Sequence, residues 1–143
     1  MAKAIRVHKT GGPEVLQLEE VSLPAPGPGE ILIRNRAIGL NFIDTYFRTG
    51  LYPAPLPFTL GNESAGDVLA VGPGVTEFKP GDRIAVVAAH GAYAEERIVP
   101  ASAVVALPDN VSYEAAASML LKGLTAEYLL HRTYPVKAGD TIL

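Results

Sequence analysis

Short apolar runs separated by glycine and proline dominate the first hundred residues. Each run has the length and the β-branched enrichment of a strand, so we predict strands over residues 4–7, 15–21, 31–40, 65–71, 83–88, 93–99 and 104–107. Turn signals such as Gly11-Gly12-Pro13 and Lys79-Pro80-Gly81-Asp82 follow one another closely, which is typical of a compact β-barrel or a strongly bent sheet. The pattern therefore predicts a mainly β chain.

Two segments have the signals of helices. Asn41 is a favourable N-cap, Asp44 places an acid in the first turn and Gly50 is a plausible end, so we predict a short helix over residues 41–49. A second helical segment begins after Ser112, another favourable cap, and runs to residue 133 through an alanine-rich start. Gly123 interrupts it at a cost of about 1 kcal/mol relative to alanine. We therefore expect two helices that meet near residues 122–124.

The last residues, Thr141-Ile-Leu143, resemble the first part of a buried strand that follows a turn. Strands usually run for about five or six residues, and an apolar strand cut after its third residue would leave its backbone unpaired. We therefore expect the natural protein to continue past Leu143. In that case the apolar face of residues 112–133 is exposed in this chain and inclined to self-association.

Composition narrows the class of protein. Hydrophobic residues make up 48% of the chain, charged residues 19%, and the net charge is −3, as in soluble globular proteins. No basic cluster indicates a nucleic-acid partner. No apolar run reaches the roughly 18 residues of a membrane span, and the first residues alternate in polarity, unlike a signal peptide, so we expect a cytoplasmic protein. The absence of cysteine excludes disulfides, thiol catalysis and thiolate metal sites.

The stretch "GLNFIDTYFRTGLYP" holds the candidate chemistry. Asn41 has two readings, because a residue that only caps a helix also lies at its positive end, where an amide can meet a ligand. Tyr46 and Tyr52 also have two readings. Prolines in the following loop can hold the second ring near the first so that both phenols face one pocket, or the two rings can simply be buried and hydrogen-bonded locally. Both alternatives remain open at this point.

The run Gly72-Pro-Gly-Val-Thr-Glu77 imitates the first half of a dinucleotide-binding fingerprint. Glu77 stands where the third glycine belongs, and no helical pattern follows. We therefore interpret it as a turn, and expect any nucleotide to be held largely by residues outside this sequence.

The order of several segments is more specific than any of them alone. "HKTGGPEVLQL", "AIGLNFIDTYFRTGLYP", "LGNESAGDVLAVGPGVTEFKPGDRI", "GAYAEE" and "LPDNVSYEAAASMLLKGLTAEYLL" together resemble the N-terminal, GroES-like half of the zinc-free, zeta-crystallin-like NADPH:quinone oxidoreductases of the medium-chain dehydrogenase/reductase superfamily. The resemblance implies a GroES-like, partly open β-barrel as substrate domain over residues 1–110. Residues 111–143 would then hold the linking helices and the start of a truncated Rossmann domain.

The resemblance also implies which metal is missing. Zinc-dependent members of the superfamily carry zinc ligands at three positions where this chain has Asn41, Asn62 and Leu121. Their cysteine-rich structural zinc lobe has no counterpart here. We therefore expect a zinc-independent protein.

By the same resemblance, Asn41 lies near the nicotinamide of NADPH, Tyr46 and Tyr52 line the substrate side, and Thr125 touches the cofactor. The substrate would be a quinone or another conjugated carbonyl compound. The full-length enzyme would be a homodimer, and residues 1–143 alone would be inactive because most of the NADPH site would be absent. Two alternatives stay open: the domain of an enoyl-thioester reductase, and a non-catalytic GroES-like module for binding or assembly.

Overall fold

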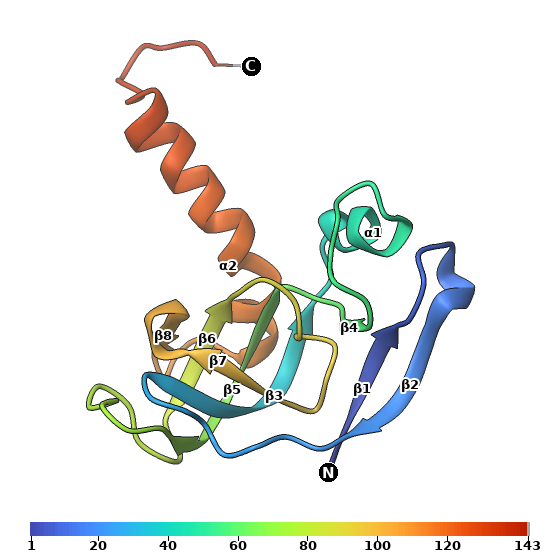
Figure 1. The fold of residues 1–143 in the computed structure, drawn as a ribbon. Helices are drawn as coiled ribbons and strands as arrows, with labels where there is room; N and C mark the ends of the chain where they lie inside the picture. Colours follow the sequence, from blue (N-terminus) through green and yellow to red (C-terminus); the bar gives the residue numbers. More distant parts are fainter. Residues whose placement is uncertain (143) are drawn as a thin grey trace.

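The computed structural model describes residues 1–142 as two antiparallel sheets, with a short and a long helix beside them (Figure 1). The three-stranded sheet has the order β2-β1-β4, formed by Leu16–Val21, Ala2–Val7 and Phe58–Thr59. The five-stranded sheet has the order β7-β3-β5-β6-β8, formed by Glu96–Pro100, Glu30–Gly39, Glu63–Val71, Arg83–Val87 and Val104–Ala106. The mainly β class predicted from the sequence is confirmed.

Backbone hydrogen bonds join the two sheets. The N–H of Ile5 in β1 donates to the carbonyl of Tyr93 at 2.7 Å, and the N–H of Glu95 donates back to Lys3 at 2.8 Å. The N–H of Asn35 in β3 donates to Glu95 at 2.8 Å, so one short segment before β7 bonds to both sheets. Register shifts between β3 and β5 bend the larger sheet, as bulges do. The result is a partly open barrel.

Apolar residues of the predicted strands form the main core. Ile31 and Ile33 of β3 are completely buried and pack with Val68, Ile84 and Val86 in the main core. The predicted strand over 93–99 begins later, at Glu96, because residues 93–95 form the connection between the sheets.

Helix α2 spans Tyr113–Glu127 and continues without a break into a π-helical turn, Tyr128–Thr133. Only its first part is buried: Ala116 and Ala117 pack on Ala65 and Ala85 of the larger sheet. Beyond them α2 rises away from the sheet (Figure 1) and exposes apolar side chains, including Met119, Leu124, Tyr128 and Leu129.

The prediction of two helices meeting near Gly123 is wrong. Gly123 lies inside one continuous helix, where an added Cβ would meet nothing closer than Met119 Cε at 3.8 Å. A cost of about 1 kcal/mol is too small to end a helix that is anchored by packing at its start. The irregularity comes later, in the π-helical turn, which no residue pattern in the sequence indicated.

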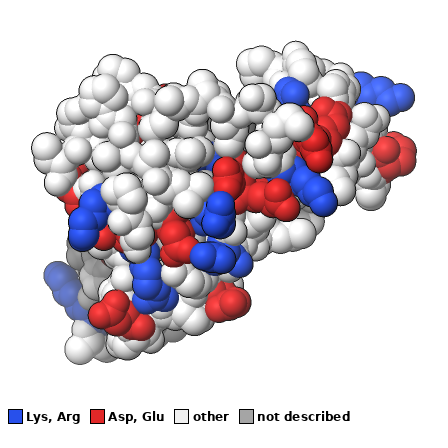
Figure 2. All heavy atoms as spheres, turned by 90° about the horizontal axis from the view of Figure 1, so that it is seen from below, with Lys and Arg blue, Asp and Glu red and all other residues white. Residues whose placement is uncertain are grey.

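The predicted terminal strand is not formed in the described residues. Thr141 and Ile142 lie outside any strand, and Ile142 is exposed, while Leu143 lies outside the described residues. On the face drawn in Figure 2, acidic and basic side chains are interspersed and neither sign forms a continuous patch.

Candidate functional site

The candidate site begins where β3 passes into helix α1, Phe42–Thr49. Asn41 occupies the N-cap position in an extended conformation, and Gly50 ends the helix with a φ of 85°, as predicted. Asn41 is the N-cap as predicted, and Asp44 joins it in a capping box. The Asp44 carboxylate accepts the Asn41 N–H at 3.0 Å, and the Asp44 N–H donates to the Asn41 backbone carbonyl at 3.0 Å. The side chain of Asn41 makes further contacts besides this cap.

That side chain is directed to a buried carboxylate, Glu63, at the start of β5. Asn41 Nδ2 donates to Glu63 Oε2 at 2.9 Å, and both residues are buried. The backbone N–H of Leu121 donates to Glu63 Oε1 at 2.7 Å, and Lys122 Nζ donates to Glu63 Oε2 at 3.1 Å. A fully buried carboxylate is stable only when it is paired and hydrogen-bonded, and these three donors fulfil that requirement.

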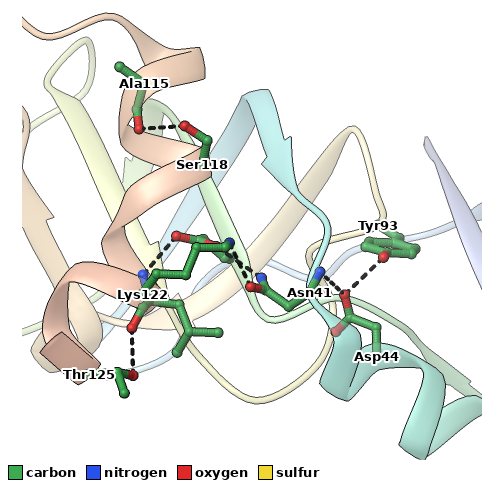
Figure 3. Close-up of polar contacts among 9 residues, drawn as sticks. Asn41, Asp44, Tyr93, Ala115, Ser118, Lys122 and Thr125 are labelled. Carbon is green, nitrogen blue, oxygen red and sulfur yellow. Dashed lines mark hydrogen bonds and ion pairs between the residues drawn. The ribbon is translucent and has the colours of Figure 1, made fainter. Parts of the chain in front are cut away.

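Lys122 also contacts Asn41 directly. Its ammonium donates to Asn41 Oδ1 at 2.7 Å, so an amide, a carboxylate and an ammonium form a closed triangle of contacts (Figure 3). The Lys122 side chain remains 55% exposed, whereas Glu63 has no exposure. We call Asn41, Glu63 and Lys122 the polar triangle.

Sequence reasoning missed Glu63 and Lys122. Both carried a weak signal: Glu63 is an acid at the start of an apolar strand, and Lys122 is the one basic residue between Tyr113 and His131. Because they are 59 positions apart, nothing local shows that they meet.

Gly39 makes the triangle possible. An added Cβ at this position would lie 2.1 Å from the Ala117 carbonyl oxygen and 2.6 Å from Glu63 Oε2. The end of β3 can therefore approach α2 only because residue 39 has no side chain.

On the other side of Asn41, Asp44 connects α1 to the loop between the sheets. Tyr93 donates its hydroxyl to Asp44 Oδ2 at 2.8 Å, while Asp44 Oδ1 is buried without a partner among the described residues (Figure 3). Burial, together with this hydrogen bond, raises the pKa of Tyr93 well above its ordinary value. Tyr93 therefore remains a neutral donor over the physiological range.

The structure brings Tyr46 and Tyr52 together. Their ring centroids are 5.3 Å apart in an edge-to-face arrangement, and the Tyr52 N–H donates to the Tyr46 carbonyl at 3.1 Å. Phe42 packs on the other edge of Tyr46 at 5.3 Å. Neither phenol hydroxyl hydrogen-bonds to another group within residues 1–142, and Tyr52 is 42% exposed. Their hydroxyls are thus available to a ligand.

Asn62, which the sequence resemblance matches to a zinc ligand, accepts a backbone hydrogen bond. Its Oδ1 accepts the N–H of His90, which has a φ of 64° and whose ring packs on Phe47 at 4.4 Å. Burial lowers the pKa of His90, so its imidazole stays neutral at physiological pH. Asn41 and Leu121, at the other two positions, both contact Glu63.

Thr125 is not in contact with the polar triangle. Its hydroxyl donates to the Leu121 carbonyl of its own helix at 2.9 Å, and the residue is exposed. It lies about one helical turn after Lys122, on the part of α2 that extends beyond the sheet (Figure 3).

Residues 1–142 hold neither a cluster of metal ligands nor a membrane-spanning helix. No three His, Asp or Glu side chains of this part of the chain gather into a group that would hold a metal ion. None of its helices combines the length and the apolar character needed to cross a membrane.

Comparison with known proteins gives consistent matches. The family model of the alcohol dehydrogenase GroES-like domain matches residues 27–109. A quinone oxidoreductase of Pseudomonas aeruginosa is 54% identical over 145 residues, covering 100% of this chain and 45% of that protein. A 2-haloacrylate reductase of Burkholderia sp. is 44% identical over 151 residues, covering 100% of this chain and 45% of that protein.

Among solved structures, the quinone oxidoreductase of Escherichia coli complexed with NADPH aligns with a TM-score of 0.93 and 50% identity. The alignment covers 95% of this chain and 42% of that chain. The chain therefore spans less than half the length of these relatives.

Proposed function

Since the chain belongs to the family of alcohol dehydrogenase GroES-like domains, we propose that it forms the substrate side of an NADPH-dependent quinone oxidoreductase that works without zinc. The observation that carries this proposal is the polar triangle at the start of α1, where the amide of Asn41 lies in a fixed position on a buried carboxylate. The names of the relatives from Pseudomonas aeruginosa and Escherichia coli support the choice of quinone as substrate and NADPH as reductant.

The described residues fit only one end of such a cofactor. Within residues 1–142, the glycine-containing turn at 72–74 leads into no helix, so it offers no helix N-terminus to a pyrophosphate. Asn41 and Thr125 are the residues we assign to the nicotinamide end, because one has a fixed amide and the other an exposed hydroxyl. When bound, NADPH supplies a hydride to the substrate.

The residues of this chain would orient the quinone and stabilise the charge that develops on its oxygen. Hydride addition makes a quinone oxygen negative, and a zinc-free site must meet that charge with hydrogen-bond donors. The hydroxyls of Tyr46 and Tyr52 are such donors, held by ring packing and by the backbone hydrogen bond between the two residues. Loss of one well-placed donor typically costs about 3 kcal/mol in the barrier, or roughly a hundredfold in rate.

The test is NADPH oxidation by the protein expressed from its complete coding sequence, with a panel of quinones. We expect Tyr46→Phe, Tyr52→Phe and Asn41→Ala each to reduce kcat/KM by roughly a hundredfold. Tyr134→Phe removes an exposed phenol elsewhere and serves as the matched control. Full activity in all three site variants would refute the assignment and leave the purely structural readings of these residues, a helix cap and two locally packed rings. We also propose that residues 1–143 alone do not oxidise NADPH with a quinone. Quinone-dependent NADPH oxidation by that purified chain would contradict this.

The relative named 2-haloacrylate reductase favours a second candidate, the reduction of a conjugated carbon–carbon double bond. The same protein should therefore be assayed with 2-haloacrylate and with an enoyl thioester. A kcat/KM for either compound above that for every quinone would replace quinone as the substrate class and retain the site.

A further inference from the structure

We propose that Lys122 is the proton donor of this site, delivering a proton to the substrate oxygen that becomes negative during reduction. The proposal rests on the proposed function, because it needs a substrate beside Asn41. It adds a catalytic residue that comes from α2 rather than from α1.

Lys122 has one N–H donor without an acceptor among residues 1–142. A lysine ammonium has three donors. Two are used within the polar triangle, for Asn41 Oδ1 at 2.7 Å and Glu63 Oε2 at 3.1 Å, and no further acceptor contacts Nζ within residues 1–142. Since the side chain is 55% exposed, the third donor is accessible to a ligand that lies against Asn41.

The ammonium is held in place rather than free to move. A lysine on a protein surface usually samples many rotamers, and fixing it costs side-chain entropy. Here two acceptors fix Nζ, and one of them, Glu63, is completely buried and itself held by the Leu121 N–H at 2.7 Å. A charged donor fixed before the substrate arrives is what stabilisation of a developing negative charge requires.

The hydrogen-bond donors that we assign to the substrate differ in charge. The Asn41 amide and the phenols of Tyr46 and Tyr52 are neutral donors, whereas Lys122 supplies a full positive charge. Charge-assisted hydrogen bonds are roughly twice as strong as neutral ones. A lysine is also able to give up its proton, and a cavity of about 320 Å³ beside it, lined by Gly39, Leu40 and Ser118 among others, connects it to solvent for reprotonation.

The step balances as follows. The hydride and its electron pair enter the substrate, and one oxygen becomes negative. The N–H bond of Lys122 then breaks, an O–H bond forms on that oxygen, and the neutral amine takes a proton from water. Overall a quinone, NADPH and one proton give a hydroquinone and NADP⁺.

Three acids face this ammonium or its partner. Glu63 contacts it from β5, Glu114 lines the same cavity from the first turn of α2, and Asp44 contacts the backbone of Asn41 from α1. Each of these carboxylates attracts the Lys122 ammonium electrostatically when it is ionised.

The first experiment needs no cofactor and no turnover. Para-nitrophenol is the probe, because its phenolate absorbs visible light and imitates the negative substrate oxygen. We expect the wild-type protein and the control Lys79→Met, which removes another ion-paired lysine at an exposed position, to bind the phenolate about tenfold more tightly than Lys122→Met. Lys122→Arg keeps the positive charge and should bind like wild type. Equal phenolate affinity in wild type and Lys122→Met, or no binding by either, would overturn the proposal.

The second experiment measures kcat for quinone reduction against pH. We expect Lys122→Met and Lys122→Arg to lose about a hundredfold in kcat, because a guanidinium holds its proton too strongly to serve as a general acid. We expect exogenous primary amines to restore part of the rate in Lys122→Ala. Wild-type kcat in Lys122→Arg would show that charge alone matters and would refute proton donation. Failure of the wild-type protein to oxidise NADPH with any quinone would refute the proposed function instead, and the phenolate experiment would still decide the placement of Lys122.

Discussion

Glu63→Gln tests whether the buried carboxylate holds the site together. The substitution keeps the shape of the side chain and removes its charge. Glu63 accepts from the Leu121 N–H on Oε1 and from Asn41 and Lys122 on Oε2, so both oxygens face donors. A glutamine has one oxygen and one NH₂ group, and in either orientation its NH₂ group faces a donor.

The size of the expected loss in stability follows from these contacts. A hydrogen bond to a charged group is worth about 1.5–3 kcal/mol, and an unsatisfied buried group adds a penalty. The Lys122 ion pair counts for less, because that side chain is half exposed and screened by water. We expect a loss of about 3 kcal/mol in the free energy of unfolding, which for a domain of this size lowers Tm by roughly 6–12 °C.

Urea unfolding followed by circular dichroism measures this loss. Glu127→Gln is the matched control, since Glu127 pairs with Arg132 at an exposed position and its loss should cost less than about 1 kcal/mol. A loss in Glu63→Gln no larger than in this control would mean that the polar triangle does not stabilise the fold, and the account of the site given above would be wrong.

Further predictions concern the pH dependence of the folding stability and the effect of replacing two glycines. Partial burial raises the pKa of Asp67, but hydrogen bonds from Tyr113 and Arg36 outweigh this effect, so the net result is a lowered pKa. The contribution of Asp67 to the folding stability is therefore present above the pKa of the unfolded state, and it is lost as pH falls through the pKa of the folded state. Asp67→Asn should therefore destabilise the protein by about 1 kcal/mol at pH 7, with the difference from wild type closing below roughly pH 4; a gap that is constant with pH in urea titrations would contradict this. Burial lowers the pKa of His90, so wild type should lose stability as pH falls below roughly 6.5, while His90→Asn should lack that slope, and equal slopes in both proteins would reject the prediction. Gly123→Ala should raise the stability by about 1 kcal/mol, whereas Gly66→Ala, whose Cβ would lie 1.9 Å from the Arg34 carbonyl oxygen, should cost more than about 3 kcal/mol. In thermal melts, a lower Tm for Gly123→Ala would contradict the first account, and an unchanged or higher Tm for Gly66→Ala would contradict the second.

Local signals predicted much of the fold. The helix starts at Asn41 and Ser112 were readable because a cap acts within one turn, and the Ser112 hydroxyl accepts the Ala115 N–H at 3.1 Å as expected. Most strands were readable because their apolar residues have strand length and lie between turn signals. The boundary near residue 93 was missed since Tyr93 and Ala94 are apolar, yet their backbone joins the two sheets rather than extending β7.

The site was only partly predictable. Asn41, Tyr46 and Tyr52 were candidates from the sequence, and the contact between the two rings was one of two open readings. The sequence did not show that the Asp44 carboxylate accepts the Asn41 N–H, because an acid in the first turn can favour a helix start without that contact. The partners of Asn41 were hidden for another reason: Glu63 and Lys122 come from β5 and α2, and sequence patterns do not encode contacts of that separation.

The polar triangle also has a place in the order of folding. Its contacts join residues 22, 59 and 81 positions apart, so loop closure must come first, and the triangle can close only after β3 and β5 have paired and α2 has docked. Contacts that form after the transition state act mainly on the unfolding rate. We therefore expect the residues of the polar triangle to act mainly on the unfolding rate of the native state. They should have little influence on the folding rate.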